Sequence, residues 1–225
     1  MPNRNAYLAV CFAETTRGAL VGLQDALEEH LTREGFSFDR MAVAELHMTF
    51  LFTGEQLSQL KADALRAWHG EVATAVEQAD LSGEIVMRLS SIISWPPSKS
   101  NLLVAQFAVP ARLHEVQKLV EASAHSSGID SSGFGAQQKY DTWMPHVTLG
   151  KVNASRAAVK GAASAAADHV WQMCGRGVDE GVGVFAPIHG VLNALLAAPA
   201  DGLTLCGDQP KQVWIDWRET LKFKP

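Results

Sequence analysis

The chain has 225 residues, of which 47% are hydrophobic, so it is long and apolar enough to form one large domain or two small lobes. Its 24 acidic and 19 basic residues give a net charge of −5. Proteins that bind long stretches of nucleic acid usually carry a net positive charge, so the composition argues against that class. Three cysteines without CxxC spacing favour reduced structural thiols in a cytoplasmic protein over a disulfide framework or a zinc site.

Strands and helices alternate in the predicted structure of the first half. The apolar run at 7–13 predicts a buried strand and is too short for a signal peptide. Apolar residues spaced by three and four predict a helix over 17–31, which Gly35 and the polar residues 37–40 end. The full predicted order is strand 7–13, helix 17–31, strand 44–53, a long or broken helix within 57–76, and strand 84–95.

The second half repeats this order. Its predicted elements are strand 101–109, a helix marked by Leu113, Val116 and Val120, a loop over 126–135, strand 144–149, an alanine-rich helix over 154–173, and strand-like residues 181–196. The repetition indicates an internal duplication with two lobes, about 1–97 and about 98–225, joined by the Pro-rich turn at 95–100. No stretch approaches the length of a membrane span, so we expect no membrane association.

A His-x-Thr pattern occurs at the same point of both repeats. In a strand, residues i and i+2 face the same side, so each copy places an imidazole beside a hydroxyl. Chance alone would produce about 0.4 such matches in this composition, and a single copy would more often be a buried histidine with a threonine that favours strands. Two copies at equivalent positions indicate one shared site. The copies are His47-Met48-Thr49 and His146-Val147-Thr148.

Two histidines and two hydroxyls in one cleft suit acid–base chemistry on a phosphate ester. Histidine titrates near neutrality, so one copy can act as a base while the other acts as an acid. Thr49 and Thr148 would donate hydrogen bonds to the non-bridging phosphate oxygens, whose charge grows in the transition state. Neither motif belongs to a pattern with a third metal ligand, so we expect neither a metal ion nor another cofactor.

The chain resembles the 2H phosphoesterase superfamily, and in particular its LigT-like RNA 2′,3′-cyclic phosphodiesterases, also called 2′-5′ RNA ligases. The resemblance lies in the segments Tyr7–Phe12, Leu46–Gly54 and Met144–Gly150. In this family a bulky apolar residue follows each His-x-Thr or His-x-Ser motif, and Phe50 and Leu149 occupy that place here.

The resemblance implies an α+β, bilobal fold. Two lobes related by a pseudo-twofold axis, each with a mainly antiparallel sheet and flanking helices, would enclose a central cleft. The resemblance is strong over about 7–54 and 102–151 and weak after about 175. The segment 185–216 is longer than a minimal family member needs, which leaves the physiological substrate open.

The resemblance also implies roles for particular residues. His47 would be the proton donor and His146 the proton acceptor in hydrolysis of a 2′,3′-cyclic phosphodiester to a 2′-phosphate, and the reverse reaction would join RNA ends through a 2′-5′ linkage. Phe12 and Lys151 lie where the family often holds the nucleobase; the alternatives are core packing for Phe12 and a solvated strand end for Lys151.

The expected partner is an RNA 3′ end or a small nucleotide, bound without a long nucleic-acid groove by a monomeric protein. A second hypothesis stays open, because some superfamily members bind nucleotides inside signalling or anchoring proteins. The chain could then be a module that binds AMP-like ligands with little turnover.

Overall fold

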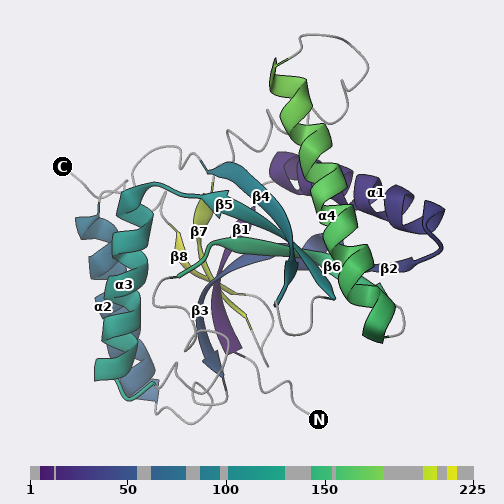
Figure 1. Cartoon of the computed structure of the whole chain (residues 1–225). Coiled ribbons are helices and arrows are strands. Elements are labelled where there is room, and N and C mark those ends of the chain that lie inside the picture. Colours follow the sequence, from purple (N-terminus) through teal and green to yellow (C-terminus); the bar gives the residue numbers. More distant parts are fainter. Residues whose placement is uncertain are drawn as a thin grey trace.

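The computed structural model describes residues 6–12, 14–54, 62–79, 87–96, 101–129, 143–153, 156–179, 200–206 and 212–216. Its described strands form a single sheet in which the order of the strands differs from their order in the sequence (Figure 1). The strands are β1 (Ala6–Phe12), β2 (Ser37–Arg40), β3 (His47–Gly54), β4 (Arg88–Trp95), β5 (Leu102–Ala108), β6 (His146–Asn153), β7 (Ala200–Cys206) and β8 (Gln212–Asp216). The helices are α1 (Glu14–Arg33), α2 (Ala62–Gln78), α3 (Ala111–Ser126), α4 (Arg156–Asp179) and the short 3-10 helix η1 (Val43–Glu45).

The predicted order of strand, helix, motif strand, helix and strand is confirmed in the first repeat, and in the second repeat it is confirmed as far as its second helix, α4. Strand β2, however, replaces the polar break expected at 37–40. Phe38 is the one buried side chain of β2, so this short segment lacks the apolar alternation that predicts a strand. It forms a strand because it pairs with β6. Strands β7 and β8 were not predicted, and the strand-like residues 181–196 lie outside the described part of the chain.

The two motif strands meet in the middle of the sheet. The strand order is β4-β5-β6-β3-β1-β7-β8, with β2 on the side of β6, and all the strand pairs are antiparallel. This confirms the α+β class with a mainly antiparallel sheet. The order is symmetric about the β6–β3 pair, and the final strand of each repeat, β4 or β7, pairs with the first strand of the other repeat. The lobe boundary near residue 97 stays a prediction.

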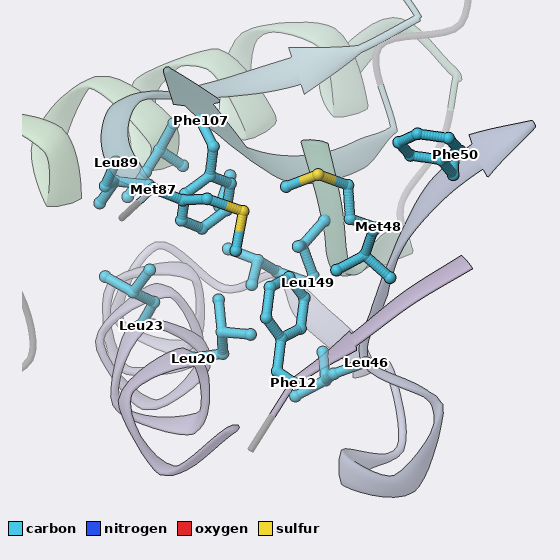
Figure 2. Close-up of a cluster of buried hydrophobic side chains, with 14 of the residues drawn as sticks. Phe12, Leu20, Leu23, Leu46, Met48, Phe50, Met87, Leu89, Phe107 and Leu149 are labelled. Atoms are coloured by element: carbon cyan, nitrogen blue, oxygen red, sulfur yellow. The ribbon is translucent and has the colours of Figure 1, made fainter. Parts of the chain in front are cut away.

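The helices form two pairs, α1 with α4 and α2 with α3, which lie at opposite sides of the sheet (Figure 1). Each pair therefore combines one helix from each repeat. The predicted apolar face of α1 is buried, including Leu20 and Leu23, and it packs with Met48 and Leu149 of the motif strands in one hydrophobic cluster (Figure 2). Burial of this cluster supplies the main favourable free energy that holds the motif strands in place.

The first helix of each repeat ends in the same hydrogen-bonded turn. At the end of α1, the N–H of Phe36 donates to the carbonyl of Leu31, and Gly35 has a φ of 79°. At the end of α3, the N–H of Ile129 donates to the carbonyl of Ala124, and the glycine before it has a φ of 78°. Both are Schellman turns, in which glycine adopts the left-handed conformation at little cost. The shared ending supports an internal duplication.

Gly150 allows β2 to approach β6 closely, which yields a prediction about stability. A Cβ atom added at Gly150 would lie 2.5 Å from Cζ of Phe38 and 2.6 Å from the carbonyl oxygen of Asp39. We therefore expect Gly150→Ala to lower the free energy of unfolding by about 1–3 kcal/mol, measured by urea denaturation. Gly161→Ala in α4 is the matched control, because nothing lies within 4 Å of its added Cβ. Equal stabilities of the two variants would contradict the prediction.

Candidate active site

The two His-x-Thr motifs lie on neighbouring antiparallel strands, with Met48 directly opposite Val147. Both of these central residues are fully buried. Because the strands run in opposite directions, the histidine of each motif lies across from the threonine of the other, at a typical Cβ separation of about 4.5–5.5 Å. These four residues point to the side of the sheet away from Met48 and Val147. We call them the motif face: His47, Thr49, His146 and Thr148.

Each motif histidine contacts a backbone carbonyl two residues before it. Nδ1 of His47 lies 2.6 Å from the carbonyl oxygen of Glu45, and Nδ1 of His146 lies 2.9 Å from that of Met144. A carbonyl oxygen can only accept a hydrogen bond, so Nδ1 is the donor in both contacts. With Nδ1 donating to a carbonyl, Nε2 is the ring atom through which each histidine would exchange a proton with a substrate.

The surroundings of His146 favour its neutral form. Burial lowers the pKa of His146 below its ordinary value, and the hydrogen bond to the carbonyl of Met144 opposes this shift without cancelling it. A neutral imidazole whose Nδ1 carries the proton has a free lone pair on Nε2. His146 is therefore suited to accept a proton at neutral pH.

Aromatic rings flank both histidines. Tyr7 of β1 stacks on His47 with 4.7 Å between ring centroids and an angle of 23° between the ring planes. Trp95 of β4 lies 6.2 Å from His146 with its plane tilted by 41°. Neither Tyr7 nor Trp95 was predicted from the sequence as a site residue, because only the strand pairing brings them to the motif face.

A polar pair lies beside His146. Gln106 of β5 is the cross-strand partner of His146, and its side chain accepts a hydrogen bond from the hydroxyl of Ser91 on β4. The Nε2 of Gln106 also lies 2.6 Å from the sulfur of Met144. This pair was not predicted either, because nothing in either strand sequence shows which residue lies across from His146.

The two residues expected near a nucleobase occupy different environments. Phe12 is 3% exposed and packs in the core, with its ring centroid 6.4 Å from that of Phe107 (Figure 2). Phe12 therefore occupies the position given by the alternative prediction, core packing, and its buried ring offers no surface for a base. Lys151 is exposed on β6, across from Asp39 and Leu102. A ligand contact for Lys151 stays a prediction.

The described residues contain neither a metal-binding cluster nor a membrane span. No group of three or more histidine, cysteine, aspartate or glutamate side chains among them could hold a metal ion. The described helices include none with the length and hydropathy needed to cross a membrane. The expected independence from metal ions stays a prediction that requires an assay.

Comparisons with known proteins identify similar folds. No protein-family profile and no curated protein sequence matches the chain. Among solved structures, Usb1 of Kluyveromyces marxianus with uridine monophosphate matches at 11% identity and a TM-score of 0.53, over 93% of this chain and 97% of that chain. TT0787 of Thermus thermophilus matches at 20% identity and a TM-score of 0.49, over 67% and 75% of the two chains. E. coli LigT complexed with 3′-AMP matches at 16% identity and a TM-score of 0.44, over 69% and 76%.

Proposed function

Because the chain has the 2H phosphoesterase fold, which it shares with Usb1 over nearly its whole length, we propose that it is a metal-independent cyclic phosphodiesterase. Its substrate class is a 2′,3′-cyclic phosphodiester at an RNA 3′ end or on a small nucleotide, and its product is a 2′-phosphate. The observation that carries the proposal is the pairing of Met48 with Val147, because this pairing places two imidazoles and two hydroxyls on one face of the sheet.

The proposed reaction uses one histidine as a base and the other as an acid. His146 accepts a proton from water on Nε2, and the water oxygen attacks phosphorus. The bond between phosphorus and the 3′ oxygen breaks, and His47 gives its Nε2 proton to that oxygen. The phosphate stays on the 2′ oxygen. Thr49 and Thr148 donate hydrogen bonds to the non-bridging oxygens, where negative charge increases in the transition state.

The direct test is turnover of a nucleoside 2′,3′-cyclic phosphate in excess EDTA. We expect hydrolysis to continue at the same rate as without chelator, because the proposed reaction uses only side chains of the motif face to transfer protons and to hydrogen-bond the phosphate. The measurement is chromatographic detection of the nucleoside 2′-phosphate. Loss of turnover on chelation would contradict the proposal, whereas a 3′-phosphate product would overturn only the assignment of the leaving oxygen.

The pH dependence of kcat/KM should be bell-shaped. The base must be neutral to act, so activity falls at low pH as His146 becomes protonated. Burial lowers the pKa of His146, so the midpoint of this acidic limb should lie below the ordinary histidine value of about 6.5. The acid must carry a proton, so activity also falls at high pH. An acidic limb centred above 6.5 would contradict the role of His146.

A nucleotide-binding module with little turnover is the second candidate. The observation that favours it is the pair of aromatic rings, Tyr7 and Trp95, beside the two histidines, because aromatic rings stack nucleobases. Titration calorimetry with 2′-AMP and 5′-AMP, run beside the turnover assay, separates the candidates. Tight binding without hydrolysis would support the module, and hydrolysis would support the enzyme.

A further inference from the structure

Two buried glutamines occupy equivalent positions on α1 and α3. Gln24 is 1% exposed and Gln117 is 3% exposed, and each lies within the apolar face of its helix. The surrounding sequences follow one pattern, in which an apolar residue lies four positions before, one before and three after the glutamine. The two copies are Leu20-x-x-Leu23-Gln24-x-x-Leu27 and Leu113-x-x-Val116-Gln117-x-x-Val120. The two glutamines were not predicted as functional residues, because each helix was predicted from its apolar residues alone.

Each glutamine binds the motif strand of the other repeat. The Nε2 of Gln24 donates to the carbonyl of Leu149 at 2.7 Å and to that of Met41 at 2.8 Å. The Nε2 of Gln117 lies 3.4 Å from the carbonyl oxygen of Phe50 and 3.5 Å from a carboxylate oxygen of Glu121. Leu149 and Phe50 are the residues that directly follow the threonines of the two motifs.

Phe50 is the extra residue of a β-bulge in β3. Leu8 of β1 pairs with Leu51 and Ala9 pairs with Thr49, so no residue of β1 lies across from Phe50. A bulge interrupts the hydrogen bonds of the ladder and changes which side of the sheet the following side chains face. Phe50 is fully buried, so its carbonyl needs a partner inside the protein, and Gln117 offers one.

Leu149 is the corresponding extra residue in β6. Leu103 of β5 pairs with Gly150 and Val104 pairs with Thr148, so Leu149 has no residue across from it in β5. Its buried carbonyl accepts from Gln24 and from the N–H of Met41. The two motif strands therefore share a bulge at the same position, and a buried glutamine reaches each bulge.

We propose that Gln24 and Gln117 are paired positioning residues that hold the two halves of the motif face separately. Gln24 fixes the strand that carries His146 and Thr148, and Gln117 fixes the strand that carries His47. Each amide restrains the bulge next to a threonine, so the motif before it keeps its hydroxyl and imidazole on the motif face. The effect on turnover rests on the proposed function, whereas the effect on the positions of the histidines does not.

Nuclear magnetic resonance of the full-length protein tests the positioning directly. Gln24→Met and Gln117→Met keep side chains of similar length but remove the amide donor. We expect Gln24→Met to move the imidazole Cε1–H signal of His146 more than that of His47, and Gln117→Met to do the reverse. Gln172→Met, on the exposed surface of α4, should move neither signal.

Kinetics of the same variants adds a second measurement. We expect each of the two buried methionine variants to lower kcat for a 2′,3′-cyclic nucleotide about tenfold or more and to change KM less than twofold, because small displacements of catalytic groups slow chemistry strongly. Gln24→Glu and Gln117→Glu should recover part of the loss, since burial favours a neutral carboxyl group that keeps one donor.

Specific outcomes would overturn the inference. It fails if the methionine variants lower only the melting temperature, if they move both histidine signals equally, or if kcat falls as far in Gln172→Met. If a methionine variant does not fold, the glutamate variant at that position is compared with wild type by the same signals. If the wild-type protein shows no turnover, the proposed function fails while the histidine signals still decide the positioning.

Discussion

His47→Ala and His146→Ala are each expected to lower kcat by about 10²–10⁴-fold, the usual contribution of a general acid or base. The reason is that each ring has Nδ1 engaged with a backbone carbonyl, so the proton transfer assigned to Nε2 is lost with the ring. The measurement is initial-rate kinetics with a nucleoside 2′,3′-cyclic phosphate, with circular dichroism to establish that each variant is folded.

The pH profiles of these variants distinguish the acid from the base. His146→Ala should remove the acidic limb of kcat/KM and His47→Ala the alkaline limb, because the remaining activity no longer depends on the missing group. His125→Ala is the control, since His125 is exposed on α3 and should retain full activity. Full activity of both motif variants would contradict the proposed function, and exchanged limbs would reverse the two roles.

Thr49→Val and Thr148→Val are each expected to lower kcat by about 10²–10³-fold, as loss of one hydrogen-bond donor to a developing charge does in other enzymes. Valine has nearly the shape of threonine and also favours strands, so the substitution isolates the hydroxyl group. Both threonines are partly exposed at the motif face, where they can reach a bound phosphate.

Two comparisons make the threonine result specific. Thr32→Val changes an exposed threonine of α1 and should leave kcat unchanged. Binding of the product, a nucleoside 2′-phosphate, should weaken less than kcat falls, because the hydroxyls interact most strongly with the transition state. Wild-type kcat in both motif variants would show that these threonines serve only as strand residues.

Local sequence patterns were sufficient to predict much of this fold. The apolar spacing of α1 and the paired His-x-Thr runs identified a helix and the two motif strands, because a side chain's position in a single helix or strand depends on its own neighbours in the chain. The repeated order of elements was predicted for the same reason. Strand β2 was missed because its formation depends on β6, which lies more than a hundred residues away in the sequence.

The candidate active site also combines features that local sequence predicts with features that depend on distant segments. The motif residues were identified from their spacing, but Tyr7, Trp95 and Gln106 reach the motif face only through strand pairing between distant segments. Phe12 illustrates the converse. Its place in a strand was predicted correctly, yet only the packing of the sheet decided that its side chain lies in the core.

The sequence by itself determined which groups could do chemistry, because the motif repeats, and it identified the likeness to the 2H phosphoesterases. The tertiary structure alone decided that Met48 pairs with Val147, and therefore that each histidine lies beside the threonine of the other repeat. It also decided that each repeat holds the other's motif strand through a buried glutamine. The physical reason is that a strand's register and partner are set by hydrogen bonds and burial between segments far apart in the chain.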